Sequence, residues 1–224
     1  MPHQRPNTAS TAIQAPRAAA VAGIVFSLLL IVSIVLMRMS VPADPADTGA
    51  WLHTRAKTVG LALNLVPFAG IAFLWFIGVL RDRLGEKEDR LFASVFLGSG
   101  LLFLAMLFFT SAMVGGLILT YAADPEHVPG SLTLTFARVI VFEVMNIYAI
   151  KMAGVFMFVT STLALRTGFL ARWIAFLGFA LALSLVLSSG YVAWILVVFP
   201  LWVLLVSLDI LVDNHRVRPV AAMD

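Results

Sequence analysis

Cysteine is absent from this 224-residue chain, and charged residues make up only 12% of it. Without cysteine the chain forms no disulfide, has no thiolate nucleophile, and offers no sulfur ligand for zinc or an iron–sulfur cluster. A soluble domain carries about 25% charged residues, so this chain has roughly half the usual share. These two shortages exclude sulfur chemistry and argue against a soluble domain.

Histidine is also scarce, with four residues in the whole chain. All four lie outside the long apolar stretches, so none of them can ligate a haem or activate a serine inside a helical bundle. The chain also lacks HExxH, Gly-x-Ser-x-Gly, P-loop and TVGYG motifs. We therefore predict no catalytic residue, no metal site and no cofactor, and we do not expect an enzyme.

What the chain has in abundance is apolar sequence: 61% of its residues are hydrophobic, and its mean hydropathy is +1.00. About 20 apolar residues suffice for a helix to cross a bilayer. The sequence predicts an all-α, polytopic transmembrane bundle of one membrane domain (18–212), between a disordered tail (1–17) and a short polar tail (213–224). Its six predicted spans are 18–37, 58–80, 91–121, 135–166, 170–188 and 191–212.

Two of these spans have alternative interpretations. The first resembles a cleaved signal peptide, because Val41-Pro42-Ala43 follows it; against this, the apolar run is too long and Arg38 stands before the site. The third span exceeds the necessary length, so it is tilted, projects from the membrane, or breaks near Gly115-Gly116.

The basic residues predict the orientation. Six spans place both termini on one side, and that side holds ten of the 15 Lys and Arg residues. Cytoplasmic loops carry the excess of Lys and Arg, so both termini are expected in the cytoplasm. The membrane itself is expected to be a bacterial cell (inner) membrane. The same charges lie at span ends rather than in a basic cluster, so nucleic-acid binding is not expected.

Residues at the ends of the predicted spans resemble capping and turn signals. Ser131 or Thr133 can cap the start of the fourth helix, and Gly168 can end it. Small residues recur at four-residue spacing, as in Ser94/Gly98 and Ala149/Ala153, which favours close helix packing.

The fourth span is the one with acid and base well inside it. Glu143 and Lys151 flank Asn146, and ordinary helix geometry brings all three onto one arc. Asn64 of the second span lies at a height similar to that of Lys151. Because ionisable groups are costly in hydrocarbon, these four residues predict a substrate- or ion-binding pocket in the outer half of the bundle.

A structural interpretation of the same residues remains open. Lys151 needs to climb only about 8 Å to the membrane interface, and its apolar stem can cover much of that distance. Near the cytoplasmic end of the sixth span, Asp209 can pair with Arg172 or Arg81, which predicts a structural tether rather than a proton carrier.

Residues 67–103 (PFAGIAFLWFIGVLRDRLGEKEDRLFASVFLGSGLLF) and 166–179 (RTGFLARWIAFLGF) resemble stretches of uncharacterised bacterial multi-span membrane proteins. The resemblance covers about a quarter of the chain and implies no activity. Two functions are expected: a small-solute or ion permease or channel, or an accessory or assembly subunit that packs against other membrane proteins. The expected partners are membrane lipids, with other membrane proteins or a second copy of the chain.

Overall fold

All regular secondary structure is helical in the residues that the computed structural model describes (8–42, 44, 47–84, 90–188 and 194–216), as the sequence predicts. The elements are α1 (Thr8–Ser40), α2 (Trp51–Leu84), α3 (Arg90–Ala123), α4 (Leu132–Glu143), the π-helical segment η2 (Val144–Ala149), α5 (Ile150–Thr167), α6 (Arg172–Leu187) and α7 (Ile195–Arg216). The segments α4, η2 and α5 follow one another without a break and form one long helix.

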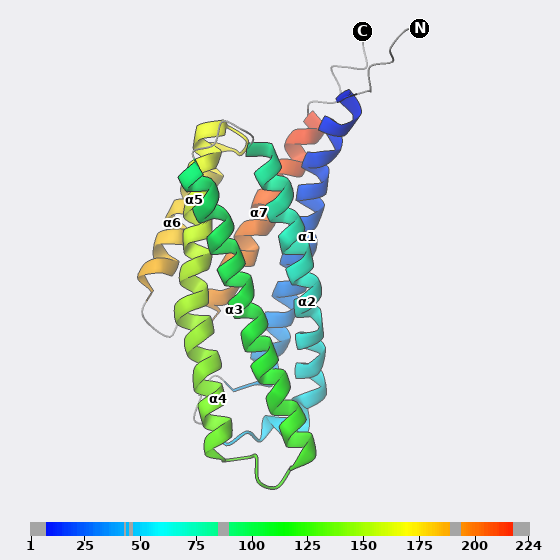
Figure 1. The fold of residues 1–224 in the computed structure, drawn as a ribbon, viewed down its shortest axis with the longest axis vertical. Coiled ribbons are helices and arrows are strands. Elements are labelled where there is room, and N and C mark those ends of the chain that lie inside the picture. The colour runs from blue at the N-terminus through cyan, green and yellow to red at the C-terminus, as the bar shows by residue number, and fades with distance from the viewer. Residues whose placement is uncertain (1–7, 43, 45–46, 85–89, 189–193, 217–224) are drawn as a thin grey trace.

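The helices run along the long axis of the molecule, and α1 begins at the end where α7 finishes (Figure 1). Five of them are long and apolar enough to cross a membrane: 17–40, 51–81, 91–123, 132–167 and 195–212. The remaining helix, α6, has 16 residues and is about 24 Å long, which is less than the ~30 Å hydrocarbon core. The chain is therefore a helical bundle with five candidate spans and one shorter apolar helix.

Several predicted boundaries require correction. Helix α1 starts at Thr8, inside the segment predicted to be a disordered tail, and α7 continues to Arg216, inside the predicted polar tail. Helix α3 continues through Gly115-Gly116 without a break. The residues beyond those needed to cross a bilayer therefore belong to the helix. Most of the connection between the predicted spans 58–80 and 91–121, and residues 189 and 190 between the predicted spans 170–188 and 191–212, lie outside the described residues.

The ends of the long fourth helix follow the predicted chemistry. Ser131 is the N-cap, and its side chain accepts a hydrogen bond from the Leu134 N–H at 3.2 Å. Gly168 follows the last residue of α5 with φ of 70°, a left-handed conformation that suits glycine.

The core of the bundle is rich in phenylalanine. Phe26 of α1 stacks on Phe73 of α2 with ring centroids 4.5 Å apart, and Phe103 of α3 meets Phe199 of α7 at 4.7 Å. A second apolar cluster, around Trp51, Leu134 and neighbouring side chains, lies next to the loops that join α1 to α2 and α3 to α4. The fold therefore has a wide central core and a separate core at one end.

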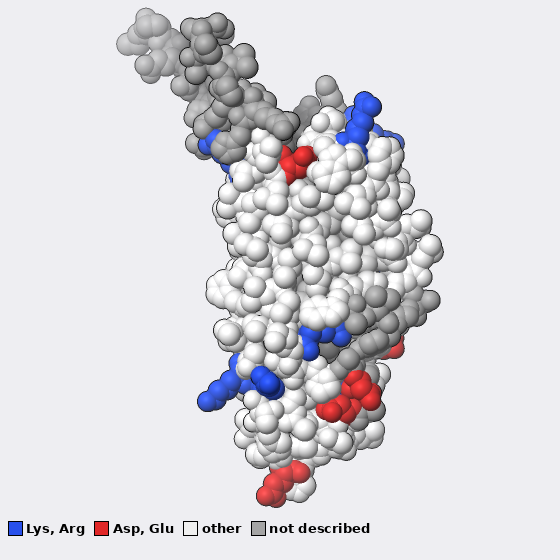
Figure 2. Space-filling model, turned by 180° about the vertical axis from the view of Figure 1, so that it is seen from behind, with Lys and Arg blue, Asp and Glu red and all other residues white. Residues whose placement is uncertain are grey.

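Charged side chains gather toward the two ends of the molecule on the face shown in Figure 2, and a band without charges separates them. Helices α2 and α3 have 34 residues each, about 51 Å, so they exceed a ~30 Å hydrocarbon core by about 20 Å. A bilayer can cover only part of their length, and the rest extends beyond it.

Candidate functional site

A cavity of about 180 Å³ lies between α1, α2, α3 and the α4–η2 helix. Its walls are mainly apolar, with side chains such as Leu30, Ile34, Leu107 and Phe142. An apolar cavity of about 150 Å³ can hold a benzene-sized molecule. The central cavity, as we call it, therefore has room for a small organic group.

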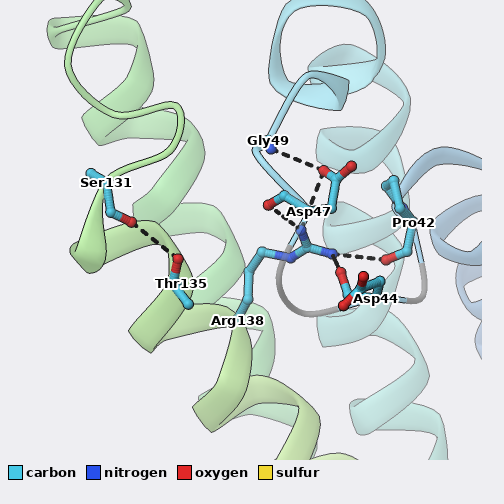
Figure 3. Close-up of polar contacts among 7 residues, drawn as sticks. All are labelled: Pro42, Asp44, Asp47, Gly49, Ser131, Thr135 and Arg138. Atoms are coloured by element: carbon cyan, nitrogen blue, oxygen red, sulfur yellow. Dashed lines mark hydrogen bonds and ion pairs between the residues drawn. The ribbon is translucent and has the colours of Figure 1, made fainter.

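The loop between α1 and α2 lies against the cavity and is held by a buried arginine. Arg138 of α4 is only 7% exposed. Its Nη1 donates to the Asp47 carbonyl at 2.9 Å and lies 3.3 Å from Asp47 Oδ1. Its Nη2 donates to the carbonyls of Pro42 and Asp44 at 2.8 and 2.6 Å (Figure 3). Together these contacts neutralise and satisfy the guanidinium, so Arg138 serves to fasten the loop.

The hydroxyl groups in the wall use their protons within the protein. Ser33 Oγ donates across to the Ala62 carbonyl of α2 at 2.9 Å, and Ser111 Oγ donates to the Leu107 carbonyl at 2.8 Å. Thr110 Oγ1 donates to its own helix in the same way. Because a hydroxyl has one proton, none of the three keeps a donor for a ligand.

Two further residues of the wall carry hydrogen-bond donors. Trp51 is 4% exposed, and its indole Nε1 is buried with no hydrogen-bond partner among the described residues. Arg38 is half-buried at the cavity, and no ion pair to it is found in the described part of the chain. The described lining contains no aspartate or glutamate. The cavity thus presents the guanidinium of Arg38 on an apolar background, and the indole N–H of Trp51 is closed off by its neighbours.

The structure does not bring the four predicted pocket residues together. Asn146 lines the cavity, and its Nδ2 donates to the Phe142 carbonyl at 2.9 Å. Asn64 and Glu143 are exposed on the outside of the bundle, and Lys151 is half-buried away from the cavity lining. The predicted pocket is therefore replaced by one that shares only Asn146 with it.

The π-helical segment explains part of this difference. The predicted arc assumed about 100° per residue from Arg138 onward, but η2 lies between Glu143 and Lys151. A π-turn holds one residue more than an α-turn, so it rotates everything beyond it relative to a regular helix. The polar residues before and after η2 consequently do not share the face that regular geometry predicts.

Sequence reasoning missed Arg138, Arg38 and Trp51. The sequence prediction places Arg138 and the aspartates of the α1–α2 loop on the same side of the membrane. That shared side was the available signal for the contacts by which Arg138 fastens the loop, which we call the loop clamp. Trp51 is buried, and its burial depends on how several helices pack. No pattern in the sequence indicates which tryptophan turns inward.

Asp209 is in contact with the connection between α5 and α6. Its Oδ2 accepts a hydrogen bond from the Ala171 N–H at 3.0 Å, one residue before the predicted partner Arg172. Arg172 is exposed, and no ion pair joins it to Asp209 in the described part of the chain. The contact satisfies a free N–H at the start of α6 instead of pairing two charges.

Among the described residues, the acidic and histidine side chains near the α1–α2 and α3–α4 loops form only pairwise contacts. His127 Nδ1 lies 2.7 Å from Asp124 Oδ1, and this hydrogen bond is the main reason why the pKa of Asp124 falls below its ordinary value. His53 bonds the Tyr121 hydroxyl. Within the described residues, no three His, Asp or Glu side chains gather as a metal-ligand group.

No protein-family model, curated protein or solved structure matches this chain. The class of protein therefore rests on the helices themselves: several long, apolar helices are those of a multi-pass membrane protein.

Proposed function

We propose that this chain is a permease or carrier of a bacterial inner membrane, and that it binds a small amphiphilic molecule in the central cavity. The observation that carries the proposal is the composition of the central cavity, an apolar hollow whose wall includes the half-buried guanidinium of Arg38, for which no ion pair is found in the described part of the chain. A ligand with an apolar body and a hydrogen-bond acceptor would fill the space and accept a hydrogen bond from Arg38.

Energetics favour a ligand at this place. A guanidinium forms strong, charge-assisted hydrogen bonds with an acceptor, and membrane helices ordinarily satisfy their polar groups internally. Most ligand pockets are apolar with a few placed polar groups. The central cavity has that composition, which supports binding as the first step of transport.

The position of the cavity supports access from the outer side. With both termini in the cytoplasm, Arg17 marks the inner end of the first span, and Arg38 lies about 32 Å further along α1. That distance is close to the thickness of the hydrocarbon core, so Arg38 is expected at the outer boundary. Leu30 is about 12 Å deeper, so the cavity extends from the outer boundary into the membrane.

The proposal can be tested with a photoreactive octanol that carries a diazirine near the end of its chain. We expect it to label peptides of α1 and α3 that line the cavity in protein reconstituted into phosphatidylcholine vesicles. Ser111→Phe places a ring at the cavity wall and should reduce this labelling at least fivefold. Mass spectrometry of the cross-linked peptides gives the readout.

Ala112→Phe is the matched control, because Ala112 is the neighbouring residue on α3 and is exposed on the outside of the bundle. It should leave labelling of the cavity peptides unchanged. If labelling is equal in the wild type and in Ser111→Phe, the cavity does not bind the probe and the proposed function is wrong.

A second candidate is an accessory subunit that packs against another membrane protein. Gly98 and Gly116 of α3 have no neighbouring atoms within 4 Å of the position where a Cβ would stand, so these small residues are uncovered in the single chain. Such positions allow close approach of another helix. Substitution of Gly98 by Leu should then release a partner that co-purifies with the wild type in mild detergent.

A further inference from the structure

The exposed face of α2 carries a polar residue at hydrocarbon depth. Lys57 and Arg81 bound the uncharged part of this helix, and they are about 36 Å apart along it. A ~30 Å hydrocarbon core centred between them places Asn64 about 7 Å below its nearer surface. Asn64 is exposed on the outside of the bundle, so in a single copy its amide faces lipid.

The Asn64 amide has no hydrogen-bond partner within the described part of the chain. Its side chain is too short to reach the membrane boundary, as those of lysine and arginine do. Pro67 has no N–H to donate to the Leu63 carbonyl, so an acceptor beside Asn64 also lacks its usual partner. Polar groups left unsatisfied in hydrocarbon are strongly unfavourable, so this part of α2 requires a partner from outside the chain.

Asn64 belongs to a regular row of exposed side chains. The row, which we call the α2 seam, consists of Leu61, Asn64, Phe68, Ile71 and Trp75. Its members alternate at spacings of three and four residues, and they share about 80° of the helix surface. The four apolar members are each more than half exposed. Such a 3.5-residue repeat is the pattern by which two helices pack as a left-handed pair, both in water and in membranes.

The surroundings of the α2 seam leave room for another helix. Helix α2 packs against α1 and α3 and lies at an edge of the bundle (Figure 1). Gly60 and Gly78 flank the two ends of the seam, and neither has neighbouring atoms within 4 Å of the position where a Cβ would stand. Small, uncovered residues allow two helix backbones to approach closely. Exposed apolar side chains alone indicate only contact with lipid, so the amide is the feature that requires a protein partner.

We infer that the α2 seam is a dimer interface, and that its occupant is the α2 seam of a second copy of this chain. Two copies inserted in the same orientation have Asn64 at the same depth. An asparagine amide both donates and accepts hydrogen bonds, so the two Asn64 side chains satisfy each other across a two-fold axis. A single asparagine in a 3.5-residue seam fixes the register and the number of helices in coiled coils.

A second copy fits the seam better than an unrelated membrane helix. Another protein would need a polar group of its own at this depth, whereas an identical chain brings Asn64 to the correct height. Residues 58–80 contain no charged side chain, so pairing of identical helices brings no like charges together in the hydrocarbon. Lys57 lies outside this uncharged part, where lipid head groups and water solvate it.

Because the chain contains no cysteine, single introduced cysteines report this interface directly. In oxidised phosphatidylcholine vesicles, Phe68→Cys and Ile71→Cys should each form disulfide-linked dimers at least about fivefold faster than Leu183→Cys, since a disulfide requires close Cα atoms. Leu183 is the matched control, because it is exposed at a similar depth on α6, at the opposite edge of the bundle (Figure 1). Equal rates for the seam and control cysteines would mean random collision and would overturn the interface.

The contribution of the amide is measured by Förster transfer between donor- and acceptor-labelled copies that are diluted with lipid. Asn64→Leu should raise the protein-to-lipid ratio at half-dimerisation by about fivefold to thirtyfold, which is the effect of one hydrogen bond between model membrane helices. Asn64→Gln keeps the amide and should stay within about threefold of the wild type. Because Asn64 is exposed in the single copy, the Tm of the dilute, monomeric protein should not fall in either variant.

Two results would contradict the dimer. If Asn64→Leu dimerises as well as the wild type, the amide does not hold the interface. If Phe68→Cys cross-links to a copy with Leu183→Cys but not to another Phe68→Cys copy, the seam meets a different surface and the two-fold arrangement is wrong.

Discussion

Individual polar residues decide the properties of the end of the bundle at which the α1–α2 and α3–α4 loops lie. Arg138 has its donors satisfied by a loop of its own chain, whereas Trp51 has a buried donor left over. A satisfied group of this kind stabilises the fold, whereas a buried donor without a partner lowers its stability. The two residues therefore have different expected roles, although both line the same cavity.

Replacement of Arg138 by Met should destabilise the protein by about 2–3 kcal/mol. The change leaves the Asp47 carboxylate and three loop carbonyls without their hydrogen-bond donor. The partial exposure of Asp47 makes the loss of stability smaller than for a fully buried pair. Such a loss corresponds to a fall in Tm of roughly 5–10 °C in detergent. Arg55→Met, at an exposed position, should shift the Tm by less than about 2 °C. Equal shifts in the two variants would mean that the clamp contributes nothing.

At the scale of elements, the fourth helix shows how one local irregularity repositions side chains. Val144–Ala149 is π-helical, and Asn146 within it donates to the Phe142 carbonyl. The segment separates the helix into α4, which carries the loop clamp, and α5, which packs in the centre of the bundle. The faces that α4 and α5 present to the rest of the bundle are therefore rotated relative to each other, although the two segments belong to one continuous helix.

Close packing of α5 against α6 depends on Gly154. A Cβ at this position would lie 2.8 Å from Val186 Cγ2 and 3.1 Å from the Ala182 carbonyl oxygen. Gly154→Ala should therefore cost about 1–3 kcal/mol, because the backbone of α6 must move away. Thermal unfolding in detergent would measure the change.

Gly98→Ala provides the comparison for this substitution. Nothing lies within 4 Å of a Cβ at Gly98, so alanine should be neutral or stabilise the helix by up to about 1 kcal/mol. If the two substitutions have the same effect on the Tm, helix propensity outweighs packing and the α5–α6 contact is looser than the structure indicates.

At the scale of the whole molecule, the main question is how many helices cross the membrane. Five are long enough, and α6 is shorter than the hydrocarbon core. Six crossings with cytoplasmic termini remain our proposal, supported by the excess of basic residues on one side.

The absence of cysteine allows a clean test of this topology, because single introduced cysteines have no background. In intact spheroplasts, Glu126→Cys and Ser188→Cys should react with a membrane-impermeant maleimide. Arg81→Cys should react only after permeabilisation, since it belongs to the cytoplasmic side. Labelling of Ser188→Cys only after permeabilisation would show that α6 does not cross, and that the proposed count of six is wrong.

The sequence by itself determined the helical class and the approximate bounds of the helices, and it narrowed the cap of the fourth helix to Ser131 or Thr133, because these depend on local properties. Apolar runs of sufficient length require helices in a bilayer, and a serine before such a run satisfies free N–H groups. The tertiary structure alone decided the site. Trp51 turns inward, Arg138 reaches residues more than 90 positions away, and η2 shifts the helix phase. Contacts of this kind depend on how whole helices pack, and regular helix geometry applied to one segment does not contain that information.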